Sequence, residues 1–471
     1  MKIAFGTEGW RAVIAEQFTF DNVRVVTQAM AEHFVAHTPA GGSLKLAVGY
    51  DTRFLSDRFA TAVCEVFAGN GIRSVLSDRS VPTCAVSRYV VSHHLPAGIV
   101  VTASHNPAAY NGLKIKEAFG GSATQETVAS IESRIGRHPV RRVAVEDAFR
   151  KGLVSQANFL PDFLAGIRAS VNLSAIRRSS LKIMVDSMHG TGNGLIAQLL
   201  TGGRCRVETL HTEPDPLFGG HAPEPIGLHL RELARAVKQC RAHIGLANDG
   251  DADRLGVLGP DGKFVNPGQV LCILLDHLMA TRRMRGAVVK TVSNTSMIDR
   301  LARELGLKVL EVPVGFKHVA KLMMEDDVLI GGEESGGIGV RGYLPERDGI
   351  FMGLLLLEAM AAQKQGLLQI LRRLERLAGR WYYARKDLTL SMDQVETVFE
   401  RLKRTPPAEL VGVPVREVKT LDGIKLIARD DSWLLFRRSG TEPIVRVYAE
   451  SPMAGRVDRL LDAGIRMIQA I

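Results

Sequence analysis

Cysteine and aromatic residues are scarce in this sequence. The five cysteines in 471 residues lie far apart and form no CxxC pair, so we expect buried, reduced thiols and neither disulfides nor a zinc site. Aromatic residues make up 6% of the chain and are not interleaved with its scattered basic pairs. Because nucleic-acid sites combine basic grooves with such stacking residues, the net charge of +10 is interpreted as a solvated surface, with no nucleic-acid partner.

Long hydrophobic runs are missing as well. The longest, residues 351–362, has 12 residues and contains Glu358, whereas a membrane span needs about 20. The first residues, MKIAFGTEGWRA, lack the apolar core of a secretory signal. We therefore expect no membrane partner and a cytoplasmic location. With 46% apolar and 23% charged residues, the composition is typical of a folded globular chain, and its length suggests roughly two to four domains.

Short apolar runs alternate with amphipathic stretches along most of the chain, which predicts an α/β fold. Runs at residues 44–49, 181–185 and 287–290 each lead into a polar turn and a helical stretch, and this repetition indicates three related modules. After Gly379, strand-like runs at residues 381–390, 415–420, 433–437 and 444–449 are followed by an amphipathic C-terminal helix, which indicates an α+β module of a different kind. The expected domains are 1–150, 151–258, 259–379 and 380–471.

Two local predictions support this division. Residues 255–258 and 264–265 are expected to form a hairpin around a Gly-Pro-Asp-Gly turn, with a helix over residues 268–283 after it. Thr124 is suited to cap a helix over residues 124–135, whose apolar residues repeat at helical spacing. The polar, aperiodic stretch that follows this helix favours a domain boundary near residue 150.

The first loop with chemical potential is NDGDADR, residues 248–254. Asp249, Asp251 and Asp253 alternate on a turn after an apolar run, so their oxygens can converge on one hard divalent cation such as Mg²⁺. A calcium-binding EF-hand does not fit, because Arg254 and Pro260 stand where that loop needs glycine and glutamate. The alternative is a solvated acidic turn.

The second loop is TASHNP, residues 102–107, which follows an apolar run and precedes NGLK. Ser104 on such a turn can present its hydroxyl, or a phosphate carried on it, to a cleft. A nucleophile–base pair with His105 is disfavoured, because neighbours on a turn usually point apart and no GxSxG motif is present. A turn stabilised by serine and asparagine side chains is the plainer alternative.

Two further polar loops follow strand-like runs. In GGEESGG, residues 331–337, acidic acceptors and a hydroxyl stand among glycines, which suits the hydroxyl groups of a sugar. In RRSGTEP, residues 437–443, an arginine fork, two hydroxyls and exposed amides together suit a phosphate. A glycine-rich turn and a salt-bridged hairpin are the respective alternatives.

These four loops, in this order, together with the opening FGTEGWRA, resemble the α-D-phosphohexomutase superfamily over essentially the whole chain. Members of this superfamily move phosphate between the 1 and 6 positions of hexose phosphates. The resemblance implies a four-domain architecture, with three related α/β modules of mixed sheets and a C-terminal α+β domain around a central cleft. It also implies a hexose phosphate substrate, while the oligomeric state stays open.

The resemblance assigns a role to each matching residue. Ser104 is the expected phosphoserine, and one of its phosphate oxygens is expected to join Asp249, Asp251 and Asp253 around Mg²⁺. The expected catalytic neighbours are Lys114 in proton transfer, Arg11 and Arg254 as cations, and His105 in support. The expected substrate contacts are Glu333 and Ser335 on the sugar, Lys317 and His318 in the specificity loop, and Arg437, Ser439, Gly440 and Thr441 on the distal phosphate.

Physical reasoning adds two expectations. Phosphoryl transfer depends mainly on charge neutralisation and alignment, which Mg²⁺ and these cations can supply. For Lys114 to act as a base it must lose a proton, and burial among cations would lower its pKa; a purely electrostatic role is the alternative. Arg438 departs from the family pattern, which commonly has proline or alanine there.

The sugar loop GEESGG resembles the glucose-preferring type, whereas dual-specificity members resemble GEMSGH and phosphoglucosamine mutases GEQSGH. The expected function is therefore a phosphoglucomutase that interconverts glucose 1-phosphate and glucose 6-phosphate, with glucose 1,6-bisphosphate as intermediate and activator. A phosphomannomutase or a dual-specificity enzyme is the alternative within the superfamily. More distant alternatives are a catalytically silent phosphosugar-binding protein and a metal-dependent phosphatase.

Overall fold

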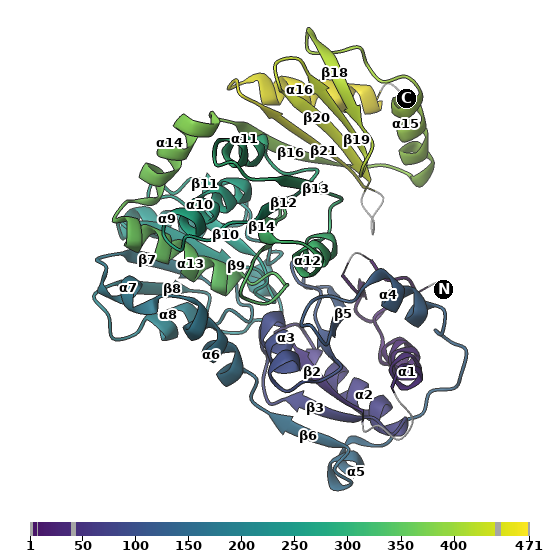
Figure 1. Cartoon of the computed structure of the whole chain (residues 1–471). Coiled ribbons are helices and arrows are strands. Elements are labelled where there is room, and N and C mark those ends of the chain that lie inside the picture. The colour runs from purple at the N-terminus through teal and green to yellow at the C-terminus, as the bar shows by residue number, and fades with distance from the viewer. Residues whose placement is uncertain (1–2, 7, 39–43, 439–443, 470–471) are drawn as a thin grey trace.

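The computed structural model describes residues 3–6, 8–38, 44–438 and 444–469, and these form four sheets that follow one another along the chain (Figure 1). The first three sheets mix parallel and antiparallel strands, and the fourth is antiparallel. This is the predicted architecture of three α/β modules and a C-terminal α+β module. Each is referred to below by the number of its sheet.

The first sheet has the strand order β1-β5-β4-β2-β3-β6. β2 is parallel to β3 and β4, whereas β5 is antiparallel to β4 and β1. β6, which follows the expected boundary near residue 150, is an outer strand parallel to β3. The strands are β1 (Trp10–Val13), β2 (Lys45–Tyr50), β3 (Arg73–Ser77), β4 (Ala97–Val101), β5 (Tyr110–Glu117) and β6 (Val154–Ala157). The helices are α1 (Phe20–Ala36), α2 (Ser56–Gly69), α3 (Thr83–Ser92), α4 (Gln125–Glu132) and α5 (Val145–Arg150).

The second sheet has the order β11-β10-β9-β7-β8, with β7 parallel to β8 and β9 and with β10 antiparallel to β9. The predicted hairpin is confirmed, because β10 and β11 pair around its turn. The strands are β7 (Lys182–Asp186), β8 (Arg206–Leu210), β9 (Ile244–Asn248), β10 (Leu255–Leu258) and β11 (Phe264–Val265). The helices are α6 (Leu160–Ser170), α7 (Leu173–Arg178), α8 (Leu195–Leu200), the 3₁₀ turn η1 (Phe218–Gly220) and α9 (Arg231–Gln239).

The third sheet has the order β13-β12-β14-β15, in which only β15 of the described strands is antiparallel to its neighbour. The strands are β12 (Ala287–Thr291), β13 (Val309–Val312), β14 (Val328–Gly332) and β15 (Ile338–Val340). The helices are α10 (Pro267–Ala280), α11 (Ser296–Glu304), α12 (Phe316–Glu325), α13 (Gly349–Gln363) and α14 (Leu367–Ala378). α10 confirms the helix that was predicted after the hairpin.

The fourth sheet, at the top of Figure 1, has the order β16-β21-β20-β19-β18-β17. Its strands are β16 (Tyr382–Thr389), β17 (Glu409–Leu410), β18 (Val413–Lys419), β19 (Ile424–Ala428), β20 (Trp433–Arg438) and β21 (Ile444–Ser451). Its helices are α15 (Met392–Arg404) and α16 (Arg456–Gln469). The sequence pattern predicted β16, β18, β20, β21 and α16 but missed α15, β17 and β19.

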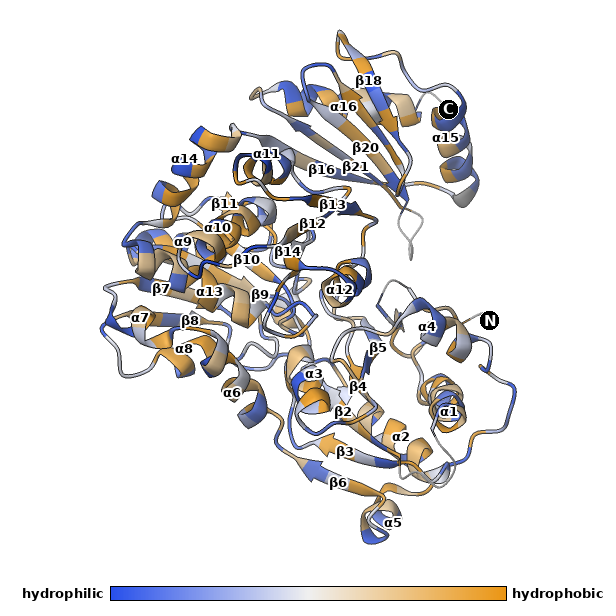
Figure 2. Ribbon diagram, viewed as in Figure 1, coloured by the Kyte–Doolittle hydropathy of each residue, from blue (hydrophilic) through white to orange (hydrophobic). Residues whose placement is uncertain are grey.

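The longest apolar run of the sequence lies in α13, which contacts α7, α10, β9 and β10 and is buried on all sides over most of its length. Figure 2 shows α13 as largely hydrophobic, in contrast to α14 with its apolar and polar faces. Glu358, the charged residue of the run, accepts a hydrogen bond from Arg282 Nη2 at 2.7 Å. A buried charge that is paired in this way is tolerated inside a core. Among the described residues, no helix has the length and apolar character of a membrane span.

The hydrophobic cores differ between the modules. One continuous cluster joins α3 of the first module to both the second and the third modules, whereas the fourth module has its own cluster between its sheet, α15 and α16. A buried ion pair also links the first and third modules, with Lys116 Nζ at 2.5 Å from Glu346 Oε2. Removing one partner of such a pair typically costs about 3–5 kcal/mol. All five cysteines are free thiols, and four of them are buried, as predicted.

Candidate active site

The TASHNP loop connects β4 to β5 and holds Ser104 in the left-handed backbone region, with φ of 54°. The Ser104 hydroxyl is buried and donates a hydrogen bond to Asp249 Oδ2 at 2.7 Å. Its backbone N–H donates to Thr102 Oγ1. Arg53 donates to the carbonyls of Ser104 and Asn106, at 2.7 and 2.6 Å. These bonds explain how an unfavourable backbone angle is held, because side chains from two other segments fix the loop.

Asp249, Asp251 and Asp253 lie on the loop between β9 and β10, and all three are fully buried. One oxygen from each lies within 4.8 Å of the others. Asp251 Oδ1 and Asp253 Oδ1 are buried without a hydrogen-bond partner among the described residues. Burial and the other two carboxylates raise the pKa of Asp249 well above its usual value. Hard oxygen ligands with unused lone pairs fit a divalent cation such as Mg²⁺.

Gly250 sets the distance between this acidic loop and Ser104. A Cβ atom at Gly250 would lie 2.6 Å from the Ser104 carbonyl oxygen, which is a backbone clash. Only glycine allows the two loops to approach this closely. The serine loop of the first module and the acidic loop of the second module therefore form a single site.

Lys114 lies on β5, and its ammonium group is surrounded by carboxylates. Lys114 Nζ donates to Asp251 Oδ2 at 2.7 Å and to Asp253 Oδ2 at 2.8 Å. Burial alone would lower the pKa of Lys114, but Asp251, Asp253 and Glu8 together raise it well above its usual value. The prediction that burial among cations lowers this pKa was therefore wrong, because the side chain crosses to the acidic loop of the next module.

The other predicted catalytic residues surround the same point. Arg11 Nη1 donates to Asn106 Oδ1 at 2.8 Å, and Arg254 Nε lies 3.9 Å from Asp249 Oδ2. Burial of the His105 ring in the cleft, together with Arg254 and Arg11, lowers the pKa of His105 well below its usual value. The imidazole is therefore neutral near pH 7, and its Nδ1 lies 3.4 Å from Ser104 Oγ.

The sugar-type loop GGEESGG follows β14. Glu333 Oε2 accepts from Arg347 Nη1 at 3.0 Å, and Glu333 Oε1 accepts from the Gly315 N–H at 3.1 Å. Burial raises the pKa of Glu333 to about 7 against the opposing effect of Arg347. Ser335 lines the same cavity as Glu333. Lys317 and His318 lie on the first turn of α12. Neither is among the described residues that line this cavity, although the neighbouring Gly315 is.

The last predicted loop joins β20 to β21. Arg437 is mostly buried and lines the cavity, while its Nε donates to Asp422 Oδ2 at 2.8 Å. Arg438 is exposed on the opposite face of the strand, where it pairs with Glu396 at 2.6 Å. Alternation along a strand explains why neighbouring arginines face different surroundings. Ser439, Gly440 and Thr441 lie outside the described residues.

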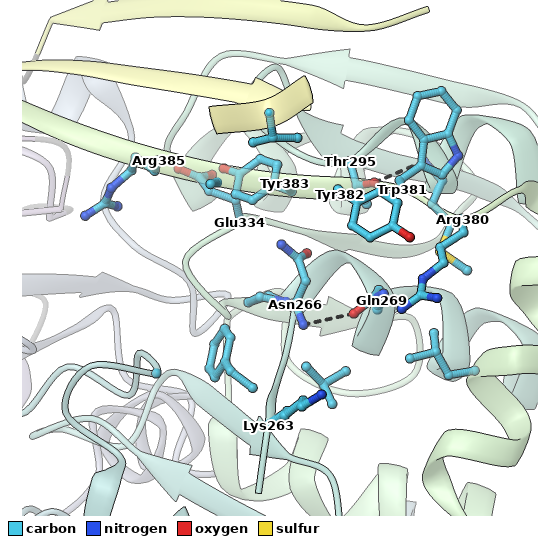
Figure 3. Close-up of a pocket in the computed structure, with 18 of the residues that line it drawn as sticks. Lys263, Asn266, Gln269, Thr295, Glu334, Arg380, Trp381, Tyr382, Tyr383 and Arg385 are labelled. Atoms are coloured by element: carbon cyan, nitrogen blue, oxygen red, sulfur yellow. Dashed lines mark hydrogen bonds between the residues drawn. The ribbon is translucent and has the colours of Figure 1, made fainter. Parts of the chain in front are cut away.

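These loops enclose a cavity of 140 Å³ that is lined by side chains from all four modules. Its lining includes six arginines and four glutamates, so it carries an excess of positive charge that suits an anion. The six are Arg11, Arg254, Arg347, Arg385, Arg437 and Arg446. A larger cavity of 930 Å³ adjoins it at Glu334, Ser335 and Arg385, where the aromatic side chains of β16 also lie (Figure 3).

Comparison with known proteins is consistent with this geometry. Models of the phosphoglucomutase/phosphomannomutase α/β/α domains I, II and III match residues 2–140, 161–262 and 266–377, and the model of the C-terminal domain matches residues 399–466. A Pyrococcus abyssi protein named as a phosphoglucosamine mutase is 31% identical over 465 residues, which cover 99% of this chain and 97% of that protein. The chain belongs to the phosphoglucomutase/phosphomannomutase family.

Other members of this family are similar over nearly their whole length. The Komagataeibacter xylinus phosphoglucomutase is 29% identical over 490 residues, which cover 96% of this chain and 87% of that protein. A crystal structure from Thermus thermophilus, named as a phosphomannomutase, has a TM-score of 0.87 and 36% sequence identity, covering 100% of this chain and 99% of that one. The predicted superfamily and its four-domain architecture are thereby confirmed.

The site of this phosphohexomutase also contains residues to which no motif pointed. Arg347, just before α13, donates to Asp253 Oδ2 at 2.7 Å and to Glu333 Oε2 at 3.0 Å, and it also pairs with Glu8. It therefore connects the acidic loop, the sugar-type loop and the N-terminal segment. Burial opposes ionisation of Glu8, but Arg347 and Lys114 lower its pKa to about 2. Arg53 lies in the polar turn that follows the run at residues 44–49, and nothing in its sequence context indicates that it holds the serine loop.

Proposed function

We propose that this protein is a Mg²⁺-dependent phosphoglucomutase that interconverts glucose 1-phosphate and glucose 6-phosphate. The reaction would proceed through a phosphate carried on Ser104 and a glucose 1,6-bisphosphate intermediate. The observation that carries the proposal is the contact of Ser104 Oγ with Asp249, 2.7 Å apart, beside a cavity rich in arginine. A hydroxyl placed between an acidic cation site and an anion-binding cavity is suited to hold a transferable phosphoryl group.

The cation site is assigned to Asp249, Asp251, Asp253 and a phosphoserine oxygen. Mg²⁺ held there would supply positive charge to the phosphoryl group. Arg11 and Arg254 would add further positive charge in a site from which bulk water is largely excluded. In this proposal Lys114 has an electrostatic role, because its raised pKa keeps it protonated, and it orients the aspartates that it contacts.

The two ends of the substrate are assigned to different loops. The phosphate that does not react would bind Arg437 and Arg446, which face each other on β20 and β21 and both line the cavity, together with Ser439, Gly440 and Thr441. The sugar hydroxyls would bind Glu333 and Ser335, with Lys317 and His318 as outer contacts. Arg347 and the Gly315 N–H each donate to one oxygen of Glu333 and hold its carboxylate in place, and the remaining lone pairs of those oxygens would accept from the sugar.

The names of the relatives include glucose, mannose and glucosamine phosphates, so they do not select one sugar. The proposed preference for glucose therefore rests on the loop GEESGG alone. Mannose is the second candidate, because the Thermus thermophilus structure named as a phosphomannomutase is 36% identical to this chain. The two sugars differ at one hydroxyl, so we expect a modest preference.

A coupled assay with glucose, mannose and glucosamine 1-phosphates in parallel, each with glucose 1,6-bisphosphate, tests the proposal. We expect glucose 1-phosphate to give the highest kcat/KM, by about tenfold, a typical effect of one substrate group. Equal or inverted efficiencies would move the assignment to a dual-specificity or mannose enzyme. Bulk release of inorganic phosphate would indicate a phosphatase, and no turnover of any sugar would indicate a silent binding protein.

Replacing Arg437 with alanine should lower kcat/KM by about two orders of magnitude. The change removes a charge-assisted fork for the distal phosphate, and binding energy at that end helps to align the reacting end. Steady-state kinetics on glucose 1-phosphate measure the effect. The matched control is Arg438→Ala on the exposed face of the same strand, which should be nearly neutral. If Arg438→Ala were the damaging change instead, the distal site would have been assigned one residue out of register.

A further inference from the structure

A second polar cavity, of 390 Å³, lies between the third and fourth modules. Residues of α11, β12 and β13 line one side, and residues of β18, β19 and β20 line the other. Figure 1 shows α11 next to the fourth sheet. We call the 140 Å³ cavity of the candidate active site the catalytic cavity. Among the described residues, none lines both this interdomain cavity and the catalytic cavity.

The lysines of the interdomain cavity have too few carboxylates. Lys290, Lys419 and Lys425 all depend on Glu311, whose oxygens lie 3.5, 3.2 and 3.7 Å from their ammonium nitrogens. Lys290 has a second partner, because Asp299 lies at 2.5 Å. Glu311 and Asp299 thus offer two close carboxylates to three ammonium groups, and the buried Glu450, which accepts from the Trp433 Nε1–H at 2.8 Å, is the next carboxylate that acts on them.

Lys425 is the clearest sign of this excess. It is 3% exposed, and its Nζ donates to the Val292 carbonyl at 2.6 Å and lies 4.2 Å from the centre of the Trp433 ring. No carboxylate oxygen of the described residues is within hydrogen-bond distance of it, since Glu311 is 3.7 Å away. Burial, and then the neighbouring Lys290, lower the pKa of Lys425 to about 8. A buried cation without a close counter-ion is costly unless an anion joins it.

The arginines add to the excess. Arg300 and Arg416 share the single carboxylate of Asp431. Arg303 is exposed at the rim, with no ion pair among the described residues. Across the whole lining, six basic side chains face four acidic ones. The buried Glu450 carboxylate, which accepts from the lining residues Ser296 and Trp433, offsets one of the two surplus charges, so one positive charge is left.

We propose that this interdomain cavity binds a phosphate-bearing dianion, which joins the third and fourth modules. The negative charge of a phosphate monoester would take up this excess, and ammonium and guanidinium groups are its usual ligands. The volume is in the range of small-molecule sites. Arg300 lies over the Trp381 ring and Lys425 over the Trp433 ring, at 5.2 and 4.2 Å from the ring centres. Inorganic phosphate and a hexose phosphate are the two candidate ligands that carry such a phosphate group.

Binding at this place would act on the position of the fourth module. Lys290 belongs to the third module and Lys425 to the fourth, so an anion between them would offset their mutual repulsion and add to the attraction that Glu311 already provides across the interface. The fourth module carries Arg437 and Arg446 and has a core of its own. A ligand here would therefore hold those arginines at the catalytic cavity. It would be a second site, beyond the proposed mutase activity.

Binding can be measured by tryptophan fluorescence in the full chain. Of the three tryptophans, Trp381 and Trp433 line the interdomain cavity, while Trp10 lies next to Arg11 in the first module. A Trp10→Phe, Arg437→Ala chain removes the remote reporter and disables the distal phosphate site. Inorganic phosphate and glucose 6-phosphate are titrated separately, with potassium chloride at matched ionic strength as the salt control. We expect a saturable change with at least one of the two phosphates and none with chloride.

Charge-removing variants in the same background locate the response. Arg303→Gln at the exposed rim and Lys425→Met at the buried floor should each raise the Kd at least about tenfold. Circular dichroism tests whether the Lys425→Met chain folds. If that chain does not fold, the exposed substitution Arg303→Gln still tests the site. Lys321→Gln on α12, whose side chain is 67% exposed, is the matched control and should bind like its parent.

If the fluorescence change saturates with inorganic phosphate, the ion alone is sufficient for binding. If it saturates only with glucose 6-phosphate, the ligand is a hexose phosphate. Either result supports the site. No saturable response to either phosphate overturns the proposal. A response that persists unchanged in Arg303→Gln, or in a folded Lys425→Met chain, overturns it as well. Because the readout is binding in a chain with Arg437 removed, failure here leaves the proposed mutase activity standing, and failure of the mutase assay does not decide this site.

Discussion

Replacing Ser104 with alanine is expected to leave a folded chain with almost no mutase activity. The proposed mechanism needs a phosphoryl group held by the enzyme itself, and alanine has no oxygen to carry it. The loss should be at least about a thousandfold, as is common when a group that forms the covalent intermediate is removed. The coupled glucose 1-phosphate assay measures turnover, and circular dichroism tests the fold.

The phosphate itself gives a second readout. Isolated protein should be a mixture of phosphorylated and unphosphorylated chains, with activity that follows the phosphorylated fraction and recovers on incubation with glucose 1,6-bisphosphate. Because Ser104 has φ of 54°, Ser104→Gly is a control that relieves backbone strain and should still be inactive. Full activity without phosphate on the peptide that contains Ser104 would refute the mechanism, and phosphate on a different residue would refute the assignment.

Replacing Asp251 with asparagine is expected to weaken Mg²⁺ binding and to remove most turnover while the chain still folds. Asp251 Oδ1 is buried and has no hydrogen-bond partner among the described residues, so it is available to a cation, and Oδ2 already accepts from Thr83 and Lys114. An amide supplies one neutral oxygen where the carboxylate supplied charge. Calorimetry should show Mg²⁺ affinity at least about tenfold weaker, a typical effect of altering a metal site.

Asp261→Asn is the matched control for that change. Asp261 is exposed on the turn of the β10–β11 hairpin and accepts a backbone hydrogen bond from Lys263, so its loss should affect neither Mg²⁺ binding nor turnover. Near-normal activity of Asp251→Asn at limiting Mg²⁺ would contradict the metal assignment. Unchanged Mg²⁺ affinity in the calorimeter would contradict it independently of activity.

Local patterns predicted the parts of the site whose chemistry lies within one loop. The alternate aspartates at 249, 251 and 253 are neighbours in sequence and in space, so their spacing predicted that their oxygens converge, which the structure confirms. The hairpin of β10 and β11 was equally local, since its turn residues separate its two strands. In contrast, α15 was not predicted, although Val395, Val398, Phe399 and Leu402 repeat at helical spacing and are buried in the core of the fourth module.

Contacts between distant segments could not be predicted in this way. Arg347 and Glu8 are 339 residues apart, and neither lies in a pattern that names a partner. Lys114 was found by resemblance, but the sign of its pKa shift depends on Asp251 and Asp253, which come from the next module. The charge around a buried group is a property of the assembled modules, and the sequence around that group does not specify it.

The continuous core that joins α3 to the second and third modules has a consequence for how the chain loses its structure. Segments that share one buried apolar cluster expose it together, so the second and third modules and the α3 side of the first module should open as one cooperative unit. The fourth module has its main cluster to itself and shares with the third module only a small one around Val292, so it can open at a lower free energy. Proteolysis under mild denaturing conditions would therefore begin in the C-terminal module and leave the serine loop and the acidic loop together in a folded remnant.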